Sequence, residues 1–293
     1  IIGLGAGAGA SVVVTPGTTT TYTVTATDAN GCEAIDMVTV TVVPDPEVTI
    51  VADGADICED GVVSITATPS DGLDCDQVRF QGRLAGTTNW GPAGSGTFTQ
   101  VGPGLAPGDY EFRAVYECSG EGCDDAASDI ITVTITPDPE VTIALDDDVL
   151  CLGESATFTA TVSGGLDCEN VTWHLRSGAQ AYQQVAIGNT YAIPTNLAAG
   201  TYTVRAEYAC GGEGCDNDTS NEVSFTVKPD PVANVDDVTI CDGESGTLTV
   251  TTSVGDAPFT YIWSNGGGTN TSATYGPLSA TTSYTVTVTD ANG

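Results

Sequence analysis

The stretch Pro44-Asp45-Pro46-Glu47-Val48-Thr49-Ile50 occurs again as Pro137-Asp138-Pro139-Glu140-Val141-Thr142-Ile143, and its beginning returns as Pro229-Asp230-Pro231-Val232. The intervals between the three copies are 93 residues (137 − 44) and 92 residues (229 − 137). This period is too long for one turn of a solenoid and matches one small β-sandwich. The chain is therefore expected to be a string of similar domains joined at these stretches.

Other landmarks recur in the same register. The motif Gly72-Leu73-Asp74-Cys75 matches Gly165-Leu166-Asp167-Cys168, and residues 116–123 match residues 208–215, each segment ending in Gly-Glu-Gly-Cys. Residues 44–136 and 137–228 are therefore predicted to be sibling domains, each complete and each with two disulfides.

The two ends of the chain belong to a second subtype. Residues 22–31 return as residues 284–293 with one change, Ala26 to Val288. Residues 1–43 are therefore predicted to be the C-terminal part of a domain, and residues 229–293 the N-terminal part of one that lacks its last strand. A natural chain seldom starts within a strand and stops on an Asn-Gly turn, so we expect a window from a longer repetitive protein.

The fold class follows from the strand pattern. Val and Thr alternate in segments such as Thr132-Val133-Thr134-Ile135, which is typical of strands with one buried face. Phe80, Trp173 and Trp263 occupy the third strand of their repeats, where an immunoglobulin-like domain buries an aromatic residue. The segment Leu105–Tyr110 resembles a tyrosine corner. The sequence predicts an all-β protein of tandem immunoglobulin-like β-sandwich domains, and stiff Pro-Asp-Pro joints predict a rod-like array.

Ten cysteines at recurring positions indicate a disulfide framework in an oxidising compartment. Four cysteines in one domain allow three connectivities. A domain of the subtype at the chain ends has two cysteines, one near its N-terminus at the position of Cys241 and one near its C-terminus at the position of Cys32. In a complete domain these two positions should bond each other. The same rule gives the pairs Cys58–Cys123, Cys75–Cys118, Cys151–Cys215 and Cys168–Cys210. Cys241 and Cys32 then take partners from a neighbouring stretch of a longer chain or from the next molecule.

The charge of the chain restricts its partners. It carries 39 acidic and 6 basic residues, a formal net charge of −33, which excludes nucleic acid and disfavours an anionic membrane surface. No run of about 18 apolar residues is present, so no membrane insertion is expected in this window. The acidic residues near the predicted joints could bind calcium, the only cofactor the sequence suggests. These residues are Asp45, Glu47, Asp138, Glu140, Asp146, Asp147, Asp148, Asp236 and Asp237.

The sequence shows no recognisable group of catalytic residues. The only histidine, His174, follows Trp173 and is expected on the solvent side of a strand. No Ser-His-Asp grouping can be assembled, so the chain is predicted not to be an enzyme. Trp90 lies in a predicted loop and corresponds to Tyr182 of the sibling repeat. It is expected either to pack within its loop or to contact a surface glycan or protein.

The turn and strand motifs resemble a known family. The resemblance is carried by residues 284–293, by Cys32, which follows the matching turn, and by residues 240–249. The chain resembles the tandem Ig-like and PKD-like repeats of giant secreted surface proteins of Bacteroidota, which include gliding-motility adhesins. The resemblance covers nearly the whole chain. It implies export to the outer surface of a bacterial cell and identifies no ligand.

Three hypotheses on function follow. The preferred one is a stiff, disulfide-reinforced stalk segment of a large cell-surface adhesin or extracellular filament, with neighbouring repeats as its partners. In the second, identical subunits polymerise into a fibre by completing each other's split domain. In the third, the domains are carbohydrate-binding accessory modules of a secreted enzyme.

Overall fold

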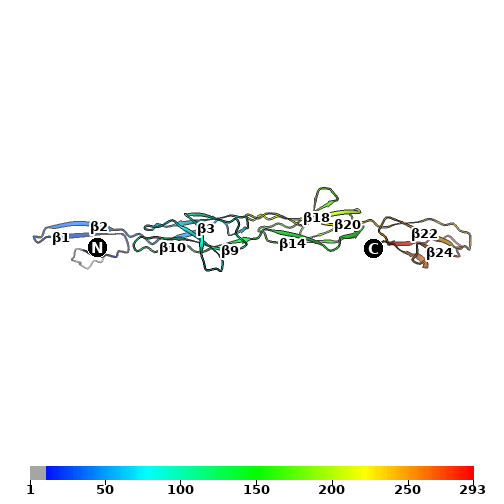
Figure 1. The fold of residues 1–293 in the computed structure, drawn as a ribbon, viewed down its shortest axis with the longest axis horizontal. Helices are drawn as coiled ribbons and strands as arrows, with labels where there is room; N and C mark the ends of the chain where they lie inside the picture. Colours follow the sequence, from blue (N-terminus) through cyan, green and yellow to red (C-terminus); the bar gives the residue numbers. More distant parts are fainter. Residues whose placement is uncertain (1–10) are drawn as a thin grey trace. The chain divides into compact units, whose positions relative to one another are not determined.

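The protein is all-β. This computed structural model describes residues 11–293, so residues 1–10 of the predicted partial domain 1–43 lie outside the described part. Apart from one short 3-10 turn, η1 (Ser264–Gly266), strands and loops make up the described ribbon (Figure 1). Within it, no helix is long and apolar enough to cross a membrane. The chain divides into two compact units between Thr136 and Pro137, and each is described by itself.

The repeat that follows Pro44 is a sandwich of two sheets. One sheet has the order β3 (Val48–Ala52), β5 (Val63–Pro69), β8 (Phe98–Val101). The other has the order β4 (Asp56–Cys58), β11 (Ile131–Thr136), β9 (Gly108–Tyr116), β6 (Arg79–Leu84), β7 (Gly91–Ser95), with β10 (Ala126–Ala127) paired to β9. Their facing side chains form one core around Phe80, which is 1% exposed. Alternation of buried and exposed residues, as along β5, produces this two-layer packing.

The sibling repeat in the second unit has the same plan. Its first sheet is β12 (Glu140–Leu145), β14 (Thr157–Ser163), β17 (Thr190–Ala192). Its second is β13 (Val149–Cys151), β20 (Val223–Lys228), β18 (Gly200–Tyr208), β15 (Thr172–Ser177), β16 (Gln183–Ile187), with β19 (Asp218–Thr219) paired to β18. Trp173 is fully buried at its centre. The predicted immunoglobulin-like sandwich is confirmed by these paired sheets and shared cores.

The tyrosine corners are also present. The Tyr110 hydroxyl donates a hydrogen bond to the carbonyl of Ala106 at 3.1 Å, and the Tyr202 hydroxyl donates one to the carbonyl of Ala198 at 2.9 Å. Each bond ties β9 or β18 to the loop that precedes it. The aromatic residue predicted for the third strand is buried in all three cases, since Trp263 is 4% exposed.

The end segments have fewer strands. β1 (Thr20–Thr27) and β2 (Glu33–Val40) form an antiparallel hairpin whose side chains are mostly exposed. Residues 229–293 form a three-stranded sheet, β21 (Val232–Val235), β22 (Gly246–Ser253), β24 (Ser272–Tyr275), and a two-stranded sheet, β23 (Thr260–Trp263), β25 (Val286–Thr289). Among the described residues β25 pairs with β23 alone, whereas β9 in the complete repeat lies between β6 and β11.

Candidate functional site

Each complete repeat carries a disulfide at the end where the chain enters it. Cys75 is bonded to Cys118 and Cys168 to Cys210, with Cα–Cα distances of 3.9 and 3.8 Å. Each pair also forms an isolated antiparallel bridge between the loop before the third strand and the end of β9 or β18. These are two of the four pairs that the repeat alignment predicted.

The glycine of the Gly-Leu-Asp-Cys motif allows this disulfide to pack closely. A Cβ atom on Gly72 would lie 2.4 Å from the Cys75 sulfur and 3.1 Å from Pro46 Cβ. On Gly165, where φ is +77°, it would lie 2.4 Å from the Cys168 sulfur. Any larger residue would collide with the bond, so the motif is a structural requirement of the disulfide. The proline of the Pro-Asp-Pro stretch thereby packs against this end of the sandwich.

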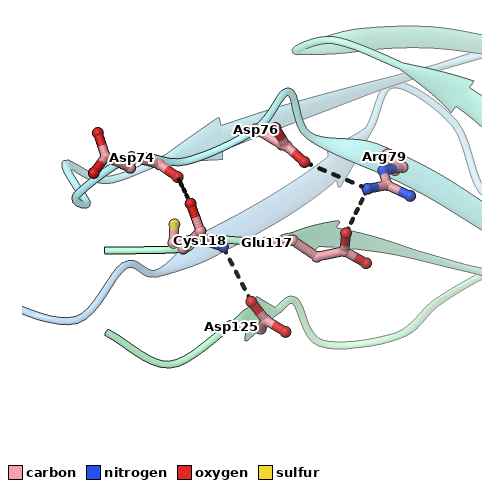
Figure 2. A network of polar contacts seen from close by, with 7 residues as sticks. Asp74, Asp76, Arg79, Glu117, Cys118 and Asp125 are labelled. Atoms are coloured by element: carbon pink, nitrogen blue, oxygen red, sulfur yellow. Dashed lines mark hydrogen bonds and ion pairs between the residues drawn. The ribbon is translucent and has the colours of Figure 1, made fainter. Parts of the chain in front are cut away.

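Polar contacts lie around Cys118, one of the two cysteines of the first disulfide, as Figure 2 shows. The backbone N–H of Cys118 donates to Asp125 Oδ1 at 3.0 Å, and Arg79 forms ion pairs with Asp76 and Glu117. These ion pairs are largely exposed and contribute little to stability. They link the residue after Cys75 to the residue before Cys118 through Arg79.

The other predicted pairs are not formed. Cys123 and Cys151 are free thiols, while Cys58 and Cys215 are each disulfide-bonded, so the predictions Cys58–Cys123 and Cys151–Cys215 are wrong for this structure. Cys58 pairs in register with Thr136, at the end of the sandwich where the chain leaves.

The reason is the length of the strands. β9 runs from Gly108, opposite Ile135 beside the Cys58 end, to Tyr116, opposite Ala126 near Cys123. Its nine residues separate the two ends by roughly 26 Å at about 3.3 Å per residue. A disulfide needs Cα atoms closer than about 7 Å. The front and back cysteines of one repeat therefore lie at opposite ends of the sandwich.

Cys32 and Cys241, the candidates for bonds between segments, are exposed free thiols. Cys32 follows a turn in which Asp28 Oδ1 accepts hydrogen bonds from the backbone N–H groups of Asn30 and Cys32, both at 2.8 Å. These bonds lower the pKa of the Asp28 carboxyl, the bond from Cys32 most of all. The suggested Cys241–Cys32 bond stays a prediction.

The same turn recurs at the other end of the chain. Asp290 Oδ1 accepts from the Asn292 N–H at 2.9 Å and its Oδ2 from the Asp256 N–H at 3.0 Å. Asp256 forms an ion pair with Lys228, the last residue of β20, at 2.7 Å. Sequence reasoning had not connected these residues, because the contact joins loops that are distant in the chain.

The Asp290 turn is expected to loosen in acid. Hydrogen bonds from Asp256 and Asn292 lower the pKa of Asp290 below the usual 3.8, so the stabilisation is complete above pH 4 and disappears as the pH falls through the lowered pKa. Hydrogen exchange at the Asp256 and Asn292 amides should show protection that falls below pH 4. Asp290→Asn, which keeps an accepting oxygen and does not titrate, should give a flat profile. Identical profiles for the two proteins would contradict this account.

Trp90 packs onto the outer face of the second sheet. The guanidinium carbons of Arg83 and Arg113 both lie 4.3 Å from the centre of its ring. In the sibling repeat, Tyr182 contacts Arg176 and Arg205 in the same way, at 4.7 and 4.4 Å. Four of the six basic residues of the chain therefore flank one aromatic position, a signal that the sequence contained and the sequence analysis missed.

We expect Trp90→Ala to lower the local stability of residues 44–136 by about 1–2 kcal/mol, because it removes two cation–π contacts. Trp90→Tyr, which installs the residue of the sibling repeat, should cost much less. Hydrogen exchange in β6 and β9 measures the change, and the 137–228 repeat serves as an internal control. Unchanged exchange in the alanine variant would favour a free ring available to a ligand.

The acidic residues suggested as calcium ligands lie in loops and strand ends. Asp138 is half-buried and the other eight are exposed. Three of them accept backbone hydrogen bonds: Asp146 from Thr157 at 2.9 Å, Asp147 from Val149 at 3.0 Å, and Asp45 from Asp124 at 3.4 Å. Such bonds stabilise turns without any ion. Calcium binding stays a prediction.

His174 is more covered than expected. Its side chain is 16% exposed, and Nε2 lies 3.3 Å from Glu207 Oε2 on the neighbouring β18. The sequence placed it correctly on the face opposite Trp173, but its side chain is less exposed than the predicted solvent-facing position implies. A cross-strand pair of this kind is a structural contact.

No protein-family model and no curated protein matches this chain. Among solved structures, it is similar to a three-domain immunoglobulin segment of titin, with 14% identity, a TM-score of 0.44, and coverage of 85% of this chain and 95% of that chain. It is also similar to the FN1–FN3 domains of chicken CNTN1, with 13% identity, a TM-score of 0.34, and coverage of 85% and 94%. The immunoglobulin-like fold of this chain rests on its own sheets and cores.

Proposed function

We propose that this chain is a structural repeat segment of a large extracellular surface protein, an adhesin stalk or filament of a bacterial cell, whose domains resist tension. One observation carries the proposal. In both complete repeats the second strand pairs in parallel with the last strand, β4 with β11 and β13 with β20. The proposal includes a relation to gliding-motility adhesins and export to the cell surface.

Parallel pairing suits a domain that is pulled from its two ends. Tension draws β4 toward the entrance of the repeat and β11 toward its exit, so the strands slide past each other. Backbone hydrogen bonds such as Thr134 N–H to the Ala55 carbonyl, at 2.7 Å, are then loaded together. In a hairpin opened from one end they would break one at a time. Breaking several bonds in one step raises the barrier to forced unfolding.

The chain contains its own comparison for a pulling experiment. Residues 229–293 have no parallel pair among the described strands, whereas the two complete repeats have one each. With all disulfides reduced, so that the load passes along the backbone, extension of the whole chain by its ends should give two similar events at high force, preceded by release of residues 229–293 at lower force. If the complete repeats opened at forces no higher than residues 229–293, the proposal would be wrong.

A second candidate is a fibre subunit that grows by completing a split domain. One observation favours it: an open groove of about 820 Å³ lies between residues 235–242 and residues 278–284. In the complete repeat, β11 occupies the corresponding place between β4 and β9. The hairpin strand β2, whose Ile35 and Met37 are 65% and 68% exposed, would gain apolar burial in such a groove.

A further inference from the structure

Cys151 lies at the exit end of the 137–228 repeat. It ends β13 and stands opposite Lys228 at the end of β20. The thiol is partly buried and free. Cys215 of the same repeat follows the bonded Cys210 at the opposite end, where its N–H donates to the Gly212 carbonyl at 3.1 Å. The backbone N–H of Cys151 donates to Glu154 Oε2 at 2.8 Å, which fixes the position of the residue.

A chain of contacts connects this position to the Asp290 turn. Lys228, opposite Cys151, reaches Asp256 at 2.7 Å, and the Asp256 N–H donates to Asp290 at 3.0 Å. Burial raises the pKa of the Cys151 thiol, and the carboxylates of Glu154, Asp290 and Asp230 raise it further, in agreement with that proximity.

The turn at Asp28, which has the same sequence as the turn at Asp290, shows where a residue that follows such a turn lies. After Asp28-Ala29-Asn30-Gly31, the N–H of Cys32 donates to Asp28 Oδ1, so Cys32 is held against the aspartate. The turn at Asp290 has the same sequence and the same bond to its third residue. A residue that follows such a turn is therefore held beside its aspartate, and at Asp290 that aspartate also accepts the Asp256 N–H.

The hairpin at the start of the chain shows how such a strand pairs. Residues 22–27 pair with β2 in a defined register, from Tyr22 opposite Val38 to Thr27 opposite Glu33. Residues 284–289 repeat that sequence with one change, and β25 begins two residues after Tyr284, the last residue that lines the groove. Among the described strands β25 pairs with β23 alone. A strand of the Cys32–Val40 type can therefore pair with β25 in the same register, with its cysteine at the Asp290 end.

The equivalent cysteine of the sibling repeat supplies a second observation. Cys58 ends β4 as Cys151 ends β13, and each stands opposite the last residue of its parallel partner strand. Cys58 is disulfide-bonded, although Cys123 is a free thiol. A disulfide thus forms at this position of the fold.

We propose that Cys151 is a cross-linking site, whose partner is the cysteine that leads an incoming last strand of the Cys32–Val40 type docked along β25. The inference rests on the strand-completion groove described under the proposed function. It differs from a Cys241–Cys32 bond, because Cys241 lines the groove together with Tyr284, whereas the residues of the Asp290 turn do not line it. The cross-link would join one repeat covalently to the next.

The bond forms by thiol–disulfide exchange. The Cys151 thiolate attacks the sulfur of a partner cysteine that is held as a mixed disulfide with glutathione. The new S–S bond forms as the old one breaks, and glutathione leaves as a thiolate that takes up the proton lost by Cys151. Because the pKa of Cys151 is raised, the rate should keep increasing with pH through the usual thiol range.

The test uses the native chain and a synthetic peptide with the sequence of residues 32–43, supplied as its glutathione mixed disulfide. Docking along β25 raises the local concentration of the peptide, so Cys151 should be modified about tenfold or more faster than Cys241. A peptide with the residues after its cysteine scrambled should lose this preference, and Cys151→Ser should abolish the fast adduct. Peptide mapping identifies the modified cysteine.

Two results would overturn the inference, and they differ in meaning. A Cys32→Ser peptide that protects β25 from hydrogen exchange, together with adducts mainly at Cys241, would show that the strand docks and that Cys151 is not its partner. Absence of both protection and selective adducts would remove strand completion as well.

Discussion

Replacing Cys75 and Cys118 together by alanine is expected to lower the free energy of unfolding of the 44–136 repeat by about 4 kcal/mol, the loop-closure value for a separation of 43 residues. The bond closes the entrance end of the sandwich, where the loop before β6 meets the end of β9. Removing it frees that loop in the unfolded chain and also leaves a gap beside Gly72. Hydrogen exchange of β6 and β9 would measure the loss repeat by repeat.

Cys123→Ala is the matched control, because it removes a cysteine of the same repeat that carries a free thiol. It should change stability by less than about 0.5 kcal/mol, as for a surface substitution. A double variant no less stable than this control would contradict the structural role assigned to the Cys75–Cys118 bond. The 137–228 repeat, with its own disulfide intact, reports on unrelated changes.

Trp173→Ala should destabilise the 137–228 repeat by about 3–5 kcal/mol. The side chain is fully buried and its ring centre lies 5.9 Å from that of Phe158 and 6.0 Å from that of Tyr191. The indole N–H also donates to the Gly188 carbonyl at 2.7 Å, so truncation leaves both a cavity and a buried carbonyl without its partner.

Trp173→Phe separates these two losses. The sibling repeat uses Phe80 at the same position, so the ring itself is compatible with the fold. This variant should cost roughly 1–3 kcal/mol, the expected penalty for the unpaired carbonyl together with a smaller ring. Denaturant unfolding followed by hydrogen exchange in β15 and β18 measures both. An alanine variant no less stable than the phenylalanine variant would show that the core is not organised around this residue.

The fold was predictable because its signals are local and repeated. The Val-Thr alternation gives strands such as β11, and the aromatic residue of the third strand and the tyrosine corner fall where an immunoglobulin-like sandwich needs them. The Cys75–Cys118 pair was predicted as well, but only as the remainder after Cys58 had been assigned to Cys123, an assignment that is wrong.

The connectivity of the remaining cysteines was not predictable from the alignment. Aligning Cys123 with Cys32 identifies equivalent positions, but it does not show that Cys58 lies a full strand length away from Cys123. That separation depends on the direction of β9 and on the parallel pairing of β4 with β11. Likewise, the contacts from Lys228 to Asp256 and from Asp256 to Asp290 join residues that are distant in the sequence. No local sequence pattern predicts them.

The most direct test of a tension-bearing role is the length released when single chains are stretched with and without a reducing agent. An intact bond bridges a sequence separation of 43 between Cys75 and Cys118, or of 42 between Cys168 and Cys210, and so hides roughly 150 Å of extended chain. In a chain carrying Cys58→Ser and Cys215→Ser, whose disulfide bonding would otherwise also respond to reduction, we predict two repeat-unfolding events that each lengthen by roughly 150 Å on reduction. Equal lengths in both conditions would contradict the account, because the disulfides would then not limit how far a loaded repeat extends.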